Sequence, residues 1–379
     1  MAINRNLSIL AQGASSTGNL LNYAGANKII NGDMAIDQRN AGASVTPTVN
    51  PTYCLDRWIS VISAASKFSV QQNAGSVAVL AGMPKNYLGV TSLSSYSLAA
   101  GDYFFQAQYI EGLNCTDLNF GSAIASDVTI SFWVRSSLTG VFGGVVQNSA
   151  QNRGYCFSYS VTVANTWERK TVTIPGDQSG TWLTTNGIGL RVFFTLGTGS
   201  TYKATPAGWS ATPIFAPTGA VDVVATNGAT WYVTGVKLEV GTVATPFVPD
   251  DYAVSLQKCY RYYEKQIWNS ANYAFFGYTY SGSAGYAMIQ YTSKRSNPAI
   301  TFPLASITNT AGRLIMADAG FNNTTGAGTF NPVNATPGLD RCRVDMSGFT
   351  GFTTNGPCSA YVATAGSPAQ AIFAADAEF

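Results

Sequence analysis

Seven tryptophans and twenty tyrosines are the side chains of this sequence best suited to binding a ligand. A flat aromatic ring packs on the apolar C–H face of a sugar, while neighbouring Asn, Gln or Asp side chains hold its hydroxyls. The candidates for such stacking are Trp133, Trp167, Trp182 and Trp209. Core packing is the competing explanation for each ring. Trp133 is the strongest candidate, because strand alternation places it opposite the buried face of its own strand.

Carboxylates could supply a glycosidase pair, in which a general acid faces a second carboxylate across the scissile bond. The candidate aspartates are Asp33, Asp37, Asp56, Asp102, Asp127 and Asp177. Sequence spacing does not place any two of them at the separation such a pair needs. The chain also has no histidine, which removes the usual general base at neutral pH and the commonest zinc ligand. We therefore predict that the chain is not an enzyme.

The cysteines are scattered, and no two form a Cys-x-x-Cys pair. They are Cys54, Cys115, Cys156, Cys259, Cys342 and Cys358. This spacing favours neither a redox motif nor a zinc site. Because cysteine is among the most frequently buried residue types, we predict buried free thiols.

The chain carries few charges. Charged residues make up 11% of it, against roughly 25% in an average soluble domain. The 21 basic residues nearly cancel the 19 acidic ones and form no cluster, so a nucleic-acid partner is not predicted. A weakly charged surface favours self-association. The first residues do not resemble a signal peptide, and no segment approaches the roughly 20 apolar residues of a membrane span.

From about residue 28 to residue 248 the dominant pattern is period-two alternation, which is typical of strands with one buried face. In one run Val128, Ile130, Phe132 and Val134 share a face. Similar runs cover residues 157–163, 190–196 and 232–240. Many short strands without a strong helical stripe predict an all-β fold, an antiparallel jelly-roll sandwich.

The pattern changes at Pro249, where two aspartates predict a helix start because carboxylates cap open backbone N–H groups. Apolar side chains then recur at steps of three and four, so we predict a connecting helix over residues 249–267. Its aromatic face holds the candidates for an oligomer interface, namely Tyr252, Leu256, Tyr260 and Tyr263. Residues 268–379 return to short strand-like pieces and predict a smaller C-terminal β domain.

Two segments resemble a pattern that recurs in bacteriophage tail-fibre and related virion proteins. The first covers residues 27–42 and is followed by Asp56-Arg-Trp58; the second covers residues 238–247 and is followed by Cys259-Tyr-Arg-Tyr-Tyr263. Segments 131–136, 166–169 and 231–236 match the family's internal strands in order. The resemblance therefore covers roughly residues 27 to 265.

The same order of elements is similar to carbohydrate-binding modules with a jelly-roll fold. Those modules often hold a structural calcium ion through carboxylates of an opening Asn-Gly-Asp segment and a closing strand. Here Asn31-Gly32-Asp33 is present, but Thr234-Gly235 stands where the resemblance implies an acidic residue. A hard cation needs several oxygen ligands. We predict no cofactor and leave a structural calcium site open.

The resemblance implies a structural virion protein, a tail fibre or adaptor subunit, and because such fibres commonly form trimers after the jelly roll, it also implies a homotrimer. Residues 1–27 would be an attachment arm, 28–248 the jelly roll, 249–267 the connecting helix and 268–379 the distal β domain. The arm's candidate contacts to other virion proteins are Ile3, Leu7, Leu10, Leu20 and Leu21. Host-surface polysaccharide is a further predicted partner, and membrane insertion is not predicted.

The subunit would be made in the cytoplasm of the bacterial host and carried on the tail or another external appendage. The alternative function is a glycan-active enzyme or a lectin-like receptor-binding tip, motivated by the tryptophans and by the resemblance to the sugar-binding modules.

Overall fold

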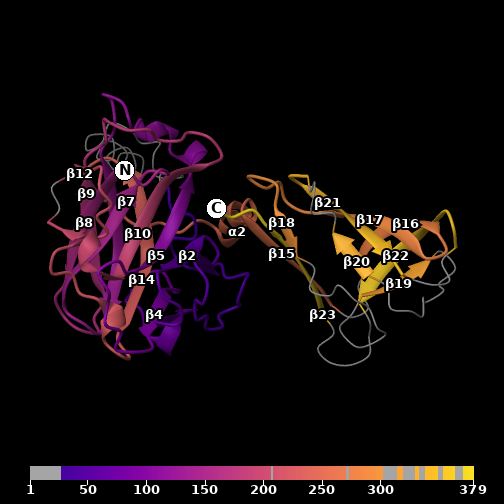
Figure 1. Ribbon diagram of the computed structural model, residues 1–379, viewed down its shortest axis with the longest axis horizontal. Helices are drawn as coiled ribbons and strands as arrows, with labels where there is room; N and C mark the ends of the chain where they lie inside the picture. The colour runs from indigo at the N-terminus through magenta and orange to yellow at the C-terminus, as the bar shows by residue number, and fades with distance from the viewer. Residues whose placement is uncertain are drawn as a thin grey trace, which may run out of the picture. The chain divides into compact units, whose positions relative to one another are not determined.

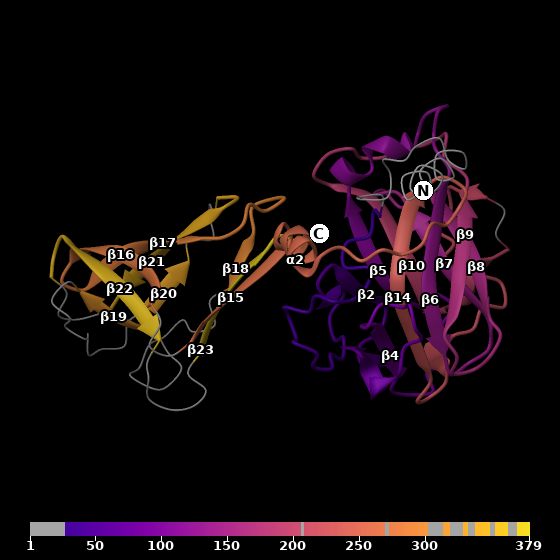
Figure 2. The ribbon, with the colours of Figure 1, turned by 180° about the vertical axis from the view of Figure 1, so that it is seen from behind.

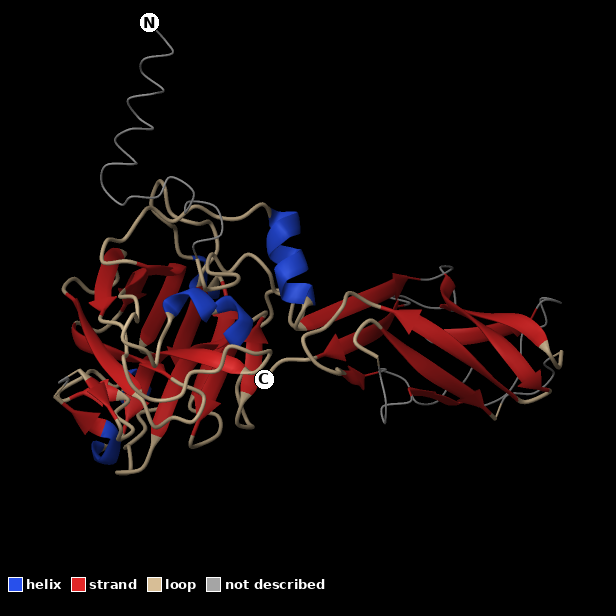
Figure 3. Ribbon diagram, turned by 90° about the horizontal axis from the view of Figure 1, so that it is seen from above, coloured by secondary structure: helices blue, strands red, loops and turns tan. Residues whose placement is uncertain are grey.

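The protein divides into two compact units between Asp250 and Asp251, next to the domain boundary predicted at residue 248. The computed structural model describes residues 27–205, 208–269, 273–301, 314–318, 329–332, 338–348, 353–362 and 370–379 (Figure 1). Strands dominate both units (Figure 3). No helix in these ranges has the length and apolar character needed to span a bilayer. The five predicted attachment contacts, Ile3 to Leu21, lie outside the described residues.

The first unit contains two antiparallel sheets, as the alternation predicts. The strands of both sheets are aligned along nearly the same axis (Figures 1 and 2). The seven-stranded sheet consists, in spatial order, of β1 (Thr52–Leu55), β2 (Trp58–Ile62), β5 (Tyr103–Glu111), β10 (Ile188–Thr198), β7 (Gly140–Gln147), β8 (Gly154–Val161) and β12 (Trp209–Ser210). The five-stranded sheet consists of β3 (Phe68–Gln72), β4 (Leu88–Ser92), β14 (Thr230–Val240), β6 (Val128–Ser136) and β9 (Glu168–Ile174).

Short elements complete this unit. The parallel pair β11 (Lys203–Ala204) and β13 (Ala216–Pro217) lies in the connection between β10 and β14. Single 3-10 turns occur at η1 (Ala74–Ser76), η2 (Gly112–Asn114), η3 (Thr116–Leu118), η4 (Ser200–Tyr202) and η5 (Val223–Ala225).

The core of the first unit lies between the two sheets and confirms the predicted faces. Phe132 and Phe194 come from opposite sheets, and their ring centroids are 5.0 Å apart. Trp231 packs 5.5 Å from Phe194 and donates from its indole N–H to the Tyr159 hydroxyl at 3.0 Å. That bond satisfies two polar groups which would be costly to bury alone.

The opening segment of the unit is bonded to its last strand, β14. The Lys28 N–H donates to the Leu238 carbonyl at 2.8 Å, and the Val236 N–H donates to the Gly32 carbonyl at 2.9 Å. The Asn27 side chain adds bonds to both strand residues. A Cβ at Gly32 would lie 2.2 Å from the Val236 oxygen, so only glycine fits this approach. The Asn-Gly-Asp motif of the sequence therefore closes the sandwich.

The second unit begins with α2 (Tyr252–Tyr260), whose first turn is capped by Asp251 accepting from the Ala253 N–H at 2.9 Å. One sheet pairs β15 (Tyr263–Asn269) and β18 (Ala299–Thr301) with the central β23 (Gln370–Asp376). The other contains, in order, β19 (Leu314–Asp318), β22 (Gly356–Val362), β16 (Tyr273–Ser281), β17 (Ala284–Gln290), β21 (Arg341–Ser347) and β20 (Thr329–Pro332).

The connecting helix is shorter than predicted, so the prediction of helix over residues 249–267 is wrong beyond Tyr260. Tyr263 starts β15 and pairs with Asp376. Backbone bonding to β23 overrides the local helical spacing. Of the proposed interface residues, Tyr252 is 62% exposed, Leu256 and Tyr260 are half-buried, and Tyr263 is buried within the unit. The four side chains therefore do not form one continuous helix face.

A buried ion pair fixes the start of β15. The Lys294 ammonium lies 2.9 Å from the Glu264 carboxylate, and the Lys294 side chain is fully buried. Lys294 also donates to the Tyr260 carbonyl at 2.5 Å. Burial lowers the pKa of Lys294, which the carboxylate opposes. Each of these two charges therefore offsets the cost of burying the other.

All six cysteines are free and buried, as predicted. Burial raises the pKa of the Cys54 and Cys115 thiols to about 12. These thiols are therefore protonated at neutral pH and poor nucleophiles.

Candidate functional site

The candidate site is a hollow on the outer face of the seven-stranded sheet, with a volume of about 530 Å³. Neighbouring residues of β10 point to opposite sides of the sheet. Phe194 enters the core, whereas Phe193 and Arg191 face outward into the hollow. Arg191 is opposite Tyr109 on β5 in the strand register. The sheet therefore supplies a rigid floor for this site.

Aromatic rings form much of the surface of the hollow. Tyr103 and Phe105 stack with their ring centroids 5.7 Å apart and an interplanar angle of 10°. Phe105 packs 5.2 Å from Phe193 on the next strand. Tyr202 and Phe215 come from the connection between β10 and β14, with centroids 4.7 Å apart. With Tyr109, also on β5, the strands thus position four rings, and the connection adds two more.

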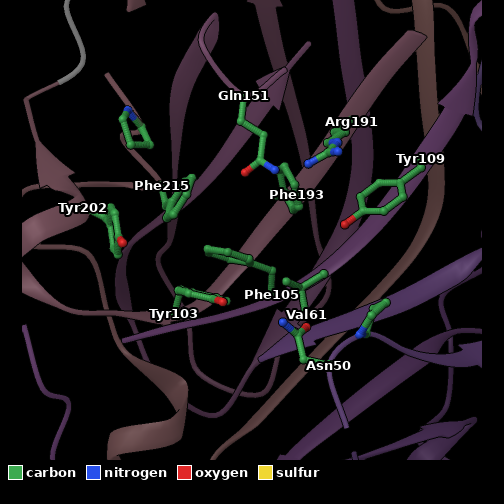
Figure 4. Close-up of a pocket in the computed structure, with 12 residues that line it drawn as sticks. Asn50, Val61, Tyr103, Phe105, Tyr109, Gln151, Arg191, Phe193, Tyr202 and Phe215 are labelled. Carbon is green, nitrogen blue, oxygen red and sulfur yellow. The ribbon is translucent and has the colours of Figure 1, made fainter. Parts of the chain in front are cut away.

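Polar groups point into the same space. Figure 4 shows the Tyr103 and Tyr109 hydroxyls, the Arg191 guanidinium and the Gln151 amide directed toward the middle of the ring of labelled side chains. Asn50 lies at the opposite side from Gln151 (Figure 4), and its amide oxygen accepts from the Ile62 N–H at 3.1 Å. The hollow therefore combines aromatic surface with groups that can donate hydrogen bonds.

Two ionisable groups of the hollow are shifted by their surroundings. Burial raises the pKa of the Tyr109 hydroxyl, although the nearby Arg191 lowers it. Burial lowers the pKa of Arg191, although Tyr109 raises it. The Arg191 guanidinium lies 4.9 Å from the centroid of the Tyr109 ring, a cation–π contact. At neutral pH the site thus holds a neutral phenol and a cation.

This arrangement can bind a molecule with a flat apolar face and several hydroxyl or acidic groups. The described residues that line the hollow include no carboxylate and no thiol. They therefore offer neither the acid pair of a glycosidase nor a cysteine nucleophile.

Trp133, the strongest candidate from sequence, lies on the other sheet. It is on the face of β6 that points away from the core, and it packs partly buried against a cluster that includes Met83, Tyr87, Trp167 and Tyr232. The segment between β3 and β4 supplies part of this cover. Trp133 is therefore less accessible than an uncovered strand residue would be, and its role in stacking stays a prediction.

The other candidate tryptophans also lie away from the hollow. Trp167 is buried and donates to the Ala78 carbonyl at 3.0 Å. Trp182 and Trp209 pack together with ring centroids 5.5 Å apart, and both contact Phe120. Their indole N–H groups donate to the backbone. The four candidates thus form two separate groups with structural contacts, and none lines the hollow.

The candidate aspartates mostly hold loops together. Asp56 accepts two bonds from Gln38 at 2.6 Å, and Asp177 pairs with Arg153 through two bonds. Asp37, Asp102 and Asp127 each accept at least one backbone N–H. Burial raises the pKa of Asp33, which backbone hydrogen bonds oppose.

The calcium site left open by the sequence gains no ligand set. Within the described ranges, no three or more acidic, cysteine or histidine side chains gather to hold a metal ion. At the position where the resemblance implies an acid, the Thr234 hydroxyl donates to the Asn86 carbonyl at 2.5 Å.

Sequence reasoning missed the rings of the hollow. A usable signal was present in the run from Tyr103 to Tyr109, where Tyr103, Phe105 and Tyr109 share the face opposite the core. The alternation of β10 likewise leaves Arg191 and Phe193 on the outside. An apolar or aromatic residue on the outer face of a strand indicates a second packed layer or a ligand surface.

The comparisons with known proteins concern structure alone. No family model and no curated protein sequence matches this chain. It is similar to the enzymatically active domain of tailspike protein 4 of bacteriophage CBA120, at 10% identity and a TM-score of 0.32, covering 57% of this chain. The matched part spans only 22% of that tailspike chain.

Two sugar-binding structures are also similar. One is a putative sugar binding protein from Bacteroides thetaiotaomicron, at 11% identity and a TM-score of 0.32, covering 57% of this chain and 100% of that chain. The other is a family 4 carbohydrate-binding module, at 14% identity and a TM-score of 0.28, covering 56% of this chain and 98% of that chain.

Proposed function

We propose that this chain is a non-enzymatic glycan-binding subunit of a bacteriophage particle, a tail fibre or adaptor that binds host-surface polysaccharide through the hollow of the seven-stranded sheet. The observation that carries the glycan-binding part is the combination of six aromatic rings with inward-pointing hydroxyl, amide and guanidinium groups. The sequence pattern at residues 27–42 and 238–247 supports the virion part.

A retention assay tests the glycan-binding part. The purified full chain is incubated with host surface polysaccharide, and both retention and cleavage are measured. We expect retention without cleavage, and we expect Tyr103→Ala to weaken it because a flat stacking surface is lost. Trp133→Ala is the matched control, since Trp133 lies on the other sheet.

The outcomes separate the alternatives. Cleavage would support the glycan-active enzyme, and loss of retention in Trp133→Ala alone would move the binding surface to the five-stranded sheet. No retention by the wild-type chain would leave only the structural role in the particle.

We also propose that the second unit is covered by further copies of the chain in a homotrimer. An aromatic strip runs across the outer face of β16 and β17, where Phe276 is 68% exposed and Tyr278, Tyr280, Tyr286 and Met288 are exposed as well. The charged groups beside it are balanced, because Arg343 pairs with Asp345 at 2.5 Å. A neutral, aromatic surface of this kind matches another copy of itself.

Light scattering at micromolar concentration tests this part of the proposal. A trimer that dissociates when Tyr280→Ser and Met288→Ser are combined would support it. A monomeric wild-type chain would contradict the homotrimer and leave the glycan site unaffected, because that site lies in the other unit.

The position in the virion is tested on purified particles. Antibodies raised against the chain should label the tail or another external appendage in electron micrographs. Absence of label from intact particles would contradict the proposed location.

A further inference from the structure

The Arg191 guanidinium is an uncompensated cation in the hollow. Its Nε is buried without a hydrogen-bond partner in the described part of the chain, and no ion pair involves this side chain there. Among the described residues, its charge-related contact is with the ring of Tyr109. Two other half-buried cations of this unit are neutralised: Arg153 pairs with Asp177, and Lys203 pairs with Asp222. Arg191 is therefore held near aromatic surface without the carboxylate that such a cation usually has.

The lining of the hollow does not supply that carboxylate. Among the described residues around it, none is acidic, and Arg191 is the cation. The remaining polar groups are amides and phenols, which donate as well as accept. The hollow thus carries a positive charge with donors around it, which complements an anion.

A second polar side chain beside Arg191 also has unpaired polar atoms in the described part of the chain. Gln147 is opposite Arg191 in the pairing of β7 with β10, so both side chains belong to the same face of the sheet. It is only 1% exposed, and neither its amide nitrogen nor its amide oxygen has a hydrogen-bond partner among the described residues. Buried amides are satisfied in nearly all native structures. The unpaired Gln147 amide thus lies next to the unpaired Nε of Arg191 on the same face of the sheet, although only Arg191 is among the residues that line the hollow.

We propose that the hollow selects acidic saccharides, with the Arg191 guanidinium binding the carboxylate of a uronic or similar sugar acid while the aromatic rings contact the sugar faces. This inference rests on the glycan-binding function proposed above. The guanidinium lies against the Tyr109 ring. Figure 4 shows the guanidinium nitrogens of Arg191 directed into the hollow. A planar guanidinium matches a carboxylate with two parallel hydrogen bonds. A neutral sugar would cover the cation without neutralising it.

The experiment compares acidic polysaccharides with their own neutral derivatives. The full chain is tested against immobilised polygalacturonate, alginate, hyaluronan and polysialic acid, and against each polymer after chemical reduction of its carboxyl groups to alcohols. We expect retention of at least one acidic polymer, binding about 10- to 100-fold weaker after reduction, as for the loss of a charged hydrogen bond. Added salt should weaken the acidic interaction.

Variants identify the residue responsible. Arg191→Gln should reduce binding to the acidic polymer to the level of its reduced form, and Arg191→Lys should keep part of the preference because it keeps the charge. Arg169→Gln is the control for net charge, since Arg169 lies on β9 of the other sheet and is exposed. An equal loss in Arg169→Gln would overturn the assignment to Arg191.

Comparing acidic and reduced polymers with the wild-type chain alone also tests the inference. Equal binding of acidic and reduced polymers, or retention of the reduced series alone, would overturn the inference while leaving glycan binding intact. Retention of neither series, together with no retention of host polysaccharide, would overturn the proposed function itself.

Discussion

Two adjacent phenylalanines on β10 allow a direct test of the division between core and site. Phe194 is fully buried between the sheets, whereas Phe193 is 4% exposed and forms part of the hollow. We compare Phe194→Ala with Phe193→Ala. Both remove the same atoms from the same strand, so backbone propensity is matched and the environment differs.

The expected magnitudes follow from the two environments. Removing a phenylalanine ring from a closed core costs about 3–5 kcal/mol, because a cavity remains. For a unit of this size that corresponds to a fall in melting temperature of about 6–20 °C. The ring of Phe193 borders open space that water can enter, so its loss costs about 1.5–3 kcal/mol, the burial contribution alone.

For glycan affinity we expect the opposite order, with a larger loss in Phe193→Ala than in Phe194→Ala. Phe193→Ala removes part of the aromatic surface, and loss of one such contact weakens glycan binding about 3- to 10-fold. Phe194→Ala should bind with nearly normal affinity at temperatures where it is folded. Thermal unfolding followed by near-ultraviolet circular dichroism and affinity electrophoresis in polysaccharide gels measure the two properties.

The reasoning is refuted if the two variants lose the same stability and Phe193→Ala keeps its affinity. That result would mean that the outer face of β10 is a second core layer. A ligand surface would then have to be sought elsewhere.

Three further predictions concern single contacts. Although burial opposes its ionisation, hydrogen bonds lower the pKa of Glu168 to about 2. Its carboxylate therefore adds stability above about pH 4.5, and that stability is lost as the pH falls toward 2. In Glu168→Gln the melting temperature should depend less on pH over that range. Trp167→Phe removes the bond to Ala78 and should destabilise the first unit by about 1 kcal/mol without changing glycan retention, which calorimetry and the retention assay can check. Lys294→Met leaves the buried Glu264 carboxylate without its cation and should destabilise the second unit by about 3–5 kcal/mol. A smaller loss of stability in denaturant titrations would show that water reaches this pair.

Strand alternation made most of the fold predictable. The pattern from Val128 to Val134 places four apolar side chains on one face, and the structure buries all of them between the sheets. Such a pattern works because a sandwich buries one side of each strand. The end of the connecting helix was not predictable in this way, because Tyr263 satisfies helical spacing and strand pairing equally well. Pairing with the distant β23 decides between them.

The site was harder to predict than the fold. Tryptophans are the most conspicuous aromatic residues in a sequence, but Trp167 is fixed by a backbone hydrogen bond and lies far from the hollow in the topology. The hollow is assembled from β5, β10 and loops such as those of Asn50 and Tyr202, whose proximity depends on sheet order. Sequence spacing does not contain that order. The lack of a carboxylate partner for Arg191 among the described residues is likewise visible only in three dimensions.

The bonds between residues 27–32 and β14 have a mechanical consequence. Because the two segments run in opposite directions, the chain enters and leaves the first unit at the same place. A pulling force transmitted through the backbone on both sides would load the bonds between Lys28 and Leu238. Because β14 is also paired with β6, and Gly241 donates to the Asp127 carbonyl, the same force would load the five-stranded sheet at the same time.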